Sequence, residues 1–310
     1  KKASVSGKAV GKAVGKAAGK TAVPKKLSSQ QKPAAEKSAP KKAAPKKDEA
    51  KEAAPKKPAS NKPATKPNAQ AGSGAAAPQS SGGGILAERI VTAPYAIEPD
   101  IAQARLSDCV AGLPPAEGNS IQALLDAHPT VKSLLESLSE SSPFLWELVT
   151  ADAARILALM ASDPERRLAD LLTAGGRAAV EASEIDDAMR ILRRMKAEAA
   201  LLIALADIGG VWPVMRATHA LTELADTAVD AAVRFALSEA ARAGRLNPKD
   251  KKEPQLGSGY IVLAMGKMGA FELNYSSDID LIVFFDPDIA PLAKDAEAAP
   301  TFVRITQRVV

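Results

Sequence analysis

The sequence lacks several features that mark secreted and membrane proteins. Cys109 is the single cysteine in 310 residues, so no disulfide can form within the chain, and we expect a reducing, cytoplasmic setting. No apolar run reaches the roughly 20 residues that a membrane-spanning helix needs. The Lys-rich start also lacks the apolar core of a secretory signal. These absences argue against both secretion and membrane insertion.

Aromatic residues, arginine and histidine are absent from residues 1–84, which consist mainly of Lys, Ala, Pro, Gly and Ser. This stretch has nineteen Lys and four acidic residues, a net charge of +15; subtracting it from the whole-chain charge of +5 leaves −10 for residues 85–310. Because it has little apolar surface to offset the entropy lost on ordering, it is predicted to be a disordered basic low-complexity tail. Nucleic acid is a candidate partner only through this tail, by counterion release; the alternative is a solubilising arm without a specific partner.

Residues 85–246 are predicted to be a helical region. Apolar residues recur at steps of three and four in residues 184–207, and again in residues 218–243, which Gly244 closes. Such apolar stripes are typical of helices packed around a core. A helix starting at Asp163-Pro164 is predicted to end at Gly175-Gly176. Other helices are predicted to begin at Asn119-Ser120 and Thr130, which can cap them, and at Ser142-Pro143 and Asp152.

The periodicity changes after a polar loop at residues 247–259, which is the best candidate for an internal boundary. Tyr260–Met265 and Asp280–Phe285 are short apolar runs rich in β-forming residues. Both are predicted to be buried strands. Between them, Gly266–Gly269 is predicted to form a turn and Ala270–Leu273 a helical turn.

Asp278 and Asp280 lie two residues apart at the entrance to the second predicted strand. Because alternate strand residues point to the same face, the two carboxylates are expected to converge, while Ile279 points the other way into the sheet. Mg²⁺ prefers oxygen ligands and leaves its remaining positions to water and substrate phosphates. Two adjacent carboxylates without a cation also repel each other. The spacing therefore predicts a magnesium site with Asp278 and Asp280 as catalytic metal ligands.

The glycine-containing turn before the aspartates supplies the second part of the predicted site. A tight turn that leads from a strand into a helical start exposes backbone N–H groups, which can bind phosphate oxygens. The turn is not a P-loop, because no Ser or Thr follows its lysine. Together with the metal it would position a phosphate chain and neutralise charge at phosphorus. The candidate nucleotide or phosphate contacts are Gly266, Lys267, Gly269, Ser276 and Ser277.

These residues, with their neighbours, resemble a known family. Three earlier segments are similar to helices of that family: Ser142–Leu145, Arg190–Asp207 and Leu221–Ala236. One segment differs, because Ala270-Phe271 stands where the family has Gly followed by a polar residue. The family is that of the glutamine synthetase adenylyltransferase/adenylyl-removing enzymes, in the DNA-polymerase-β-like nucleotidyltransferase superfamily. The residues that look like its signature are Gly266, Lys267, Gly269, Glu272-Leu273-Asn274 and Ser276–Ile282.

The resemblance implies an α+β fold. Residues 85–246 would be the helical region of the adenylyl-removing half. Residues 247–310 would begin a polymerase-β-like catalytic domain, with a mixed sheet plus helices, and residues 300–310 would be the first turns of a helix. A third carboxylate is implied on a later strand, beyond Val310. On this interpretation the chain is a fragment that is inactive alone.

The implied reaction is Mg²⁺-dependent. The adenylyl-removing half splits AMP from a tyrosine of glutamine synthetase by phosphorolysis and releases ADP, whereas the other half of the full-length enzyme attaches AMP from ATP. The implied partners are glutamine synthetase as protein substrate and, in the full-length enzyme, the PII signalling protein. The small-molecule ligands are ATP, ADP and phosphate.

Two other functions stay open from the residues alone. One is a polymerase-β-like nucleotidyltransferase that acts on RNA, with the Lys-rich tail as a tether. The acidic balance of residues 85–310 argues against it, because an RNA enzyme needs a basic surface. The other is a non-enzymatic nucleic-acid-binding protein that acts through the tail. Charge alone predicts association but no chemistry.

Overall fold

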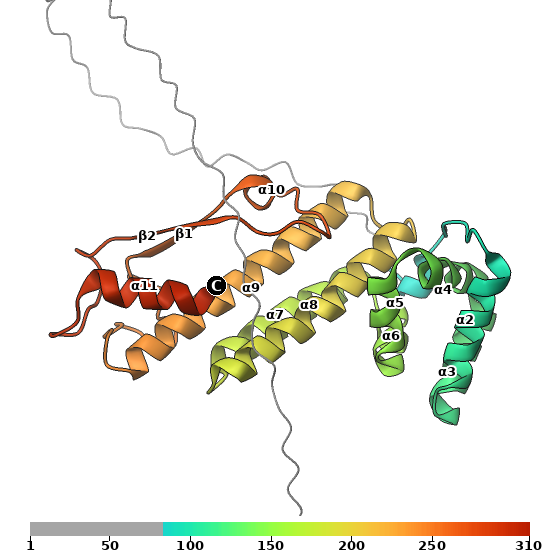
Figure 1. Ribbon diagram of the computed structural model, residues 1–310, viewed down its shortest axis with the longest axis horizontal. Coiled ribbons are helices and arrows are strands. Elements are labelled where there is room, and N and C mark those ends of the chain that lie inside the picture. The colour runs from blue at the N-terminus through green and yellow to red at the C-terminus, as the bar shows by residue number, and fades with distance from the viewer. Residues whose placement is uncertain (1–82) are drawn as a thin grey trace, which may run out of the picture. The chain divides into compact units, whose positions relative to one another are not determined.

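The structure is a computed structural model that describes residues 83–310, which belong to one compact unit. The predicted basic tail lies, but for its last two residues, outside the described residues. The described chain is mostly helical with a two-stranded antiparallel sheet, which confirms the α+β class (Figure 1). Among these residues, no helix combines the length and the apolar character needed to span a membrane.

The helices that precede the sheet follow one another along the chain with short connections. They are α1 (Leu86–Arg89), α2 (Pro99–Ala111), α3 (Pro115–Ala127), α4 (Pro129–Ser141), α5 (Pro143–Thr150), α6 (Ala153–Met160), α7 (Pro164–Glu181), α8 (Ile185–Ile208) and α9 (Val214–Arg242). The remainder is β1 (Tyr260–Ala264), α10 (Gly266–Gly269), β2 (Leu281–Phe285) and α11 (Ala298–Val309).

Capping residues explain where several helices begin. The side chains of Ser142, Asp152 and Asp163 each accept a hydrogen bond from the backbone N–H three residues later, at 3.3, 2.9 and 2.9 Å. These predicted starts are therefore confirmed. The predicted starts of α3 and α4 were too late. These helices begin at Pro115 and Pro129, because proline suits the first helical position, where its missing N–H costs no hydrogen bond.

Helix α7 continues through Gly175-Gly176, so its predicted end was wrong. Neither glycine has a positive φ; they permit close packing instead of ending the helix. A Cβ on Gly175 would lie 2.6 Å from Sδ of Met195 in α8, and one on Gly176 would lie 3.0 Å from Cγ2 of Thr227 in α9. The missing side chains let α7 lie against both long helices (Figure 1).

Helices α8 and α9 carry the centre of the core. Residues 199–206 of α8 are all buried, and both helices end as predicted at glycines with positive φ, +73° at Gly210 and +68° at Gly244. Trp212 is only 3% exposed and belongs to the same core. Its indole N–H donates to Oε1 of Glu165 at 2.8 Å, which satisfies the polar edge of a buried ring.

The sheet is covered on one face only in the part of the chain that the structure describes. Tyr260 pairs with Phe285 and Ala264 with Leu281 in antiparallel register. Tyr260 and Val262 pack against the cluster that α9 forms with α11. The prediction of fully buried strands was therefore wrong, because alternate residues face outward. The outward side chains are Ile261, Leu263, Ile282 and Phe284, which are 46, 45, 41 and 52% exposed.

Candidate functional site

The turn after β1 and the chain before β2 meet at one end of the sheet. Gly266–Gly269 is a single turn of helix, so the helical turn comes four residues earlier than predicted. Gly266 has φ +54°, and a Cβ on it would lie 3.4 Å from Oδ2 of Asp280. The backbone N–H of Met265 donates to the carbonyl oxygen of Asp280 at 2.8 Å, one step beyond the strand ladder. The predicted phosphate turn and one predicted metal ligand therefore lie next to each other.

Gly269 closes this turn. Its N–H donates to the carbonyl oxygen of Met265 at 3.1 Å. A Cβ on Gly269 would lie 2.5 Å from the carbonyl oxygen of Ala264, a separation that the backbone cannot accept without moving. Because its N–H is already bonded inside the turn, Gly269 shapes the site instead of offering that donor to a phosphate.

Asp278 and Asp280 lie in the extended segment that leads into β2, and both are exposed. Two carboxylates of this kind are oxygen donors that suit Mg²⁺, with water and phosphate left to fill the other positions. Within residues 83–310, no group of three His, Cys, Asp or Glu side chains is placed to hold a metal ion.

Ile279, between the two aspartates, is 40% exposed, so it is not buried. It lines a shallow cleft of about 530 Å³ together with Asp280 and Leu281. Val229 of α9 and Val309 of α11 form the opposite wall. The acidic segment therefore borders an open, mainly apolar hollow.

Lys267 and Ser277 come together from opposite ends of the loop that joins α10 to β2. The Lys267 ammonium donates to Oγ of Ser277 at 3.0 Å, and the Ser277 hydroxyl donates to Oδ1 of Asn274 at 2.5 Å. Ser276 is exposed next to them. A cation and a hydroxyl are therefore held on the same short loop as the two aspartates, where they can contact a phosphate group.

Three contacts that the sequence did not predict hold this loop against α8 and α9. In the first contact, the Phe271 ring stacks on His219, with centroids 5.3 Å apart. In the second, the Leu273 N–H donates to Oγ1 of Thr222 at 3.4 Å. In the third, the Tyr275 hydroxyl donates to Oδ2 of Asp207 at 3.0 Å.

Phe271 has a backbone φ of +58°, which is uncommon for any residue except glycine. Phe271 is therefore strained, and it belongs to the segment that departs from the family pattern.

The hydroxyl of Tyr275 stays protonated in this arrangement and donates a hydrogen bond. Burial raises the pKa of Tyr275, and the negative charge of the Asp207 carboxylate raises that pKa further. The phenol therefore stays protonated well above neutral pH and keeps its hydrogen bond to Asp207.

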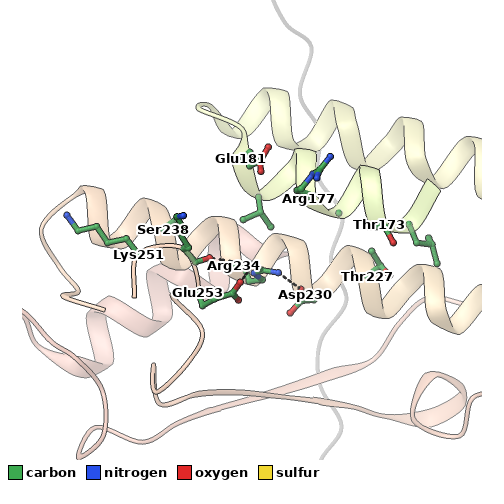
Figure 2. A pocket seen from close by; sticks show the side chains of 13 residues that line it. Thr173, Arg177, Glu181, Thr227, Asp230, Arg234, Ser238, Lys251 and Glu253 are labelled. Atoms are coloured by element: carbon green, nitrogen blue, oxygen red, sulfur yellow. Dashed lines mark hydrogen bonds and ion pairs between the residues drawn. The ribbon is translucent and has the colours of Figure 1, made fainter. Parts of the chain in front are cut away.

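A second cleft, of about 710 Å³, lies between α7, α9 and the loop at residues 251–253 (Figure 2). Arg234 crosses it and forms ion pairs with Asp230 at 3.6 Å and with Glu253 at 3.1 Å. None of the predicted phosphate or metal residues lines it. Because its central guanidinium is already paired, the chemistry is better assigned to the end of the sheet.

Comparison with known proteins identifies the family. A family model of adenylyltransferases matches residues 122–310, more than half of the chain and all of the strand–turn–strand segment. The model is that of the glutamate-ammonia ligase adenylyltransferases, and the chain belongs to this family. The predicted resemblance is thereby confirmed.

Curated relatives carry one name, "Bifunctional glutamine synthetase adenylyltransferase/adenylyl-removing enzyme". The protein of Bradyrhizobium sp. strain BTAi1 is 52% identical over 231 residues, which are 74% of this chain and 23% of the relative. That of Rhodopseudomonas palustris strain BisB5 is 50% identical over 222 residues, 72% of this chain and 22% of the relative. That of Xanthobacter autotrophicus strain Py2 is 46% identical over 233 residues, which are 75% of this chain and 24% of the relative. The chain spans less than a quarter of the length of these relatives.

Proposed function

We propose that this chain belongs to an enzyme that controls glutamine synthetase by transferring adenylyl groups, and that its strand–turn–strand segment binds metal and phosphate in that reaction. The observation that carries the proposal is the position of the Asp280 carboxylate beside Gly266, where a Cβ would lie 3.4 Å from Oδ2. It joins a phosphate-binding turn to a metal ligand inside the region that the family model matches.

Within that function, the proposed activity is removal of AMP. An oxygen of inorganic phosphate attacks the phosphorus of AMP on a tyrosine of glutamine synthetase. The bond from that phosphorus to the tyrosine oxygen breaks, the tyrosine takes up a proton, and ADP leaves. The similarity of Ser142–Leu145 to an early helix of the family supports this half of the reaction. In the full-length enzyme, addition of AMP from ATP and binding of the PII signalling protein would belong to other parts of the protein.

The residues divide the work by their chemistry. Asp278 and Asp280 would hold Mg²⁺, which supplies positive charge that stabilises a phosphoryl group during displacement. Gly266 leaves room next to Asp280 for a phosphate oxygen, because a side chain would fill that space. Lys267 adds a positive charge, and the Ser276 and Ser277 hydroxyls orient the phosphate. Positioning and electrostatics of this kind suffice for phosphoryl transfer.

The test uses the full-length protein with adenylylated glutamine synthetase and measures ADP released in the presence of phosphate and Mg²⁺. We expect Asp278→Asn with Asp280→Asn to lower the rate by roughly 100-fold or more. Asp286→Asn with Asp288→Asn, two acids at the same spacing beyond the other end of β2, is the matched control and should leave the rate within about twofold. Retained ADP release in the first double variant, or none in the unaltered protein, would overturn the proposal.

A further inference from the structure

The loop that carries the two aspartates has little structure of its own. From Ala270 to Asp280 the chain forms neither helix nor strand. The position of the carboxylates therefore depends on what the loop contacts. Two of those contacts tie its first half to α9, where Phe271 stacks on His219 and Leu273 bonds to Thr222. One contact, the hydrogen bond from Tyr275 to Asp207, lies next to the acidic segment and reaches a different helix.

Asp207 stands at an unfavourable place for an acidic residue. It is the last residue but one of α8, and the last turn of that helix contains no basic residue. The carbonyl end of a helix carries partial negative charge, so a carboxylate there is repelled and a cation would be preferred. Its bond to the Tyr275 hydroxyl gives this carboxylate a partner 68 residues away in the sequence. A bond with an ionised acceptor is stronger than one between neutral groups.

We infer that Asp207 and Tyr275 form a positioning pair that fixes the loop so that Asp278 and Asp280 face the glycine turn; this inference rests on the proposed function. Neither residue is assigned a contact with the phosphate, because the Tyr275 hydroxyl is bonded to Asp207. Tyr275 lies three residues before Asp278, so its anchor sets where the extended segment leaves the helices. Outer contacts that orient metal ligands commonly affect activity by tenfold or more when they are removed.

The pair differs from the contacts that simply hold the fold together. Leu273 is 6% exposed and Thr222 is fully buried, so their loss would leave a buried polar group and a gap. Tyr275 is 47% exposed, so removing its hydroxyl should disturb the aspartate segment more than the core. A second tyrosine hydroxyl bond provides a matched control, because the hydroxyls of Tyr260 and Thr306 lie 2.9 Å apart where β1 meets α11.

The experiment compares Tyr275→Phe, Asp207→Asn, the double variant and the control Tyr260→Phe in the full-length protein. We expect Tyr275→Phe to lower kcat about tenfold and to raise the Mg²⁺ concentration for half-maximal rate, with KM for adenylylated glutamine synthetase unchanged within about twofold. Asp207→Asn keeps an acceptor oxygen, so its kcat should fall by less than that of Tyr275→Phe. The double variant should be no slower than Tyr275→Phe, because without the Tyr275 hydroxyl the hydrogen bond to residue 207 is already absent. Tyr260→Phe should lower Tm without changing kcat.

A second readout needs no activity. Amide hydrogen exchange should become faster at Ser277 and Met265, whose N–H groups donate to Asn274 and Asp280, in Tyr275→Phe and stay unchanged there in Tyr260→Phe. An unaltered protein that releases no ADP would contradict the proposed function, and hydrogen exchange would then still decide on the pair. Unchanged exchange at these residues, an unchanged kcat in Tyr275→Phe, or losses that add in the double variant would each overturn the inference.

Discussion

The two ends of β2 each carry a pair of aspartates two residues apart, Asp278 with Asp280 before the strand and Asp286 with Asp288 after it. The second pair makes a turn. The Asp288 N–H donates to Oδ1 of Asp286 at 2.9 Å, and the Asp286 N–H donates to the carbonyl oxygen of Gly259 at 2.7 Å. Such a local side-chain bond is what Asp commonly contributes to turns.

The first pair has different surroundings. Its carboxylates are exposed, one of them adjoins Gly266, and a loop lysine lies near. The spacing of two aspartates alone thus does not distinguish a turn from a proposed metal site. The residues around each pair make that distinction. The following variants are ordered by the expected size of their effect and are chosen to test that difference.

Glycines at the two ends of the sheet give the largest expected contrast. A Cβ on Gly269 would lie 2.5 Å from the carbonyl oxygen of Ala264, and one on Gly259 would lie 2.4 Å from that of Asp286. Substitution by alanine should lower the free energy of unfolding by roughly 1–3 kcal/mol at either position, because backbone must move. Gly269→Ala should also slow ADP release about 100-fold, because it displaces the turn. Gly259→Ala should not slow this reaction.

Chemical denaturation and steady-state rates measure both effects. A large rate loss in Gly259→Ala at a temperature where the variant is folded would mean that the two ends of the sheet are not functionally distinct.

Lysines near the two ends provide the next contrast. Lys267 bonds to Ser277 inside the proposed phosphate site, whereas Lys294 is an exposed residue of the segment after β2. We expect Lys267→Met to raise KM for inorganic phosphate and to lower kcat, together by roughly 10- to 100-fold in kcat/KM. The phosphate dependence of ADP release measures this loss. An equal loss in Lys294→Met would indicate a general effect of surface charge instead of a local contact.

How far the sequence predicts this structure depends on whether the cause of each feature is local. The helix starts at Ser142, Asp152 and Asp163 were predicted, and their cause is local, because each side chain accepts from an N–H only three residues away. Gly175-Gly176 was misread as a helix end. The same residue type serves both helix ends and close packing, and only the approach of α8 and α9 separates the two roles.

The candidate site shows the same division. The aspartate pair and the glycine turn are recognisable from spacing within 15 residues, and the fold brings them together. The bond between Tyr275 and Asp207 joins residues 68 positions apart, and the bond between Leu273 and Thr222 joins residues 51 apart. No sequence pattern indicates that the members of either pair are in contact. The predicted metal, the third carboxylate and the boundary near residue 247 stay predictions.

Two threonines on α9, one fully buried and one partly buried, give a smaller contrast, in stability. The Thr222 hydroxyl accepts the Leu273 N–H at 3.4 Å and is fully buried, whereas the Thr227 hydroxyl donates only to the carbonyl oxygen of Glu223 in its own helix. Thr222→Val should lower the free energy of unfolding by about 1–3 kcal/mol, because the buried N–H loses its acceptor. Thr227→Val should cost well under half of that. Equal costs in urea denaturation would show that the loop contact adds no stability.

The smallest expected effect is the pH dependence of stability that comes from Glu165. This carboxylate has several partners, in contrast to the exposed Asp278 and Asp280. Burial raises the pKa of Glu165, but hydrogen bonds from Arg89 and Trp212 outweigh it, so the pKa lies below its usual value. A carboxyl group whose pKa is lower in the folded protein stabilises the fold above its unfolded pKa, about 4.3, and this stability is lost as the pH falls through the folded value. Protonation weakens the ion pair with Arg89, at 2.5 Å, that ties α1 to α7.

Thermal unfolding between pH 7 and pH 3 measures this effect. Tm should fall in the acid part of the range, and Glu165→Gln should have a lower Tm at pH 7 and a smaller change below pH 4.3. The control is Glu147→Gln, on α5, which should follow the unaltered protein. Asp278→Asn should do so as well, because that carboxylate is exposed and contributes little to folding. An equal loss of the acid transition in Asp278→Asn would mean that the exposed pair also stabilises the fold, and the distinction between the two kinds of carboxylate would fail.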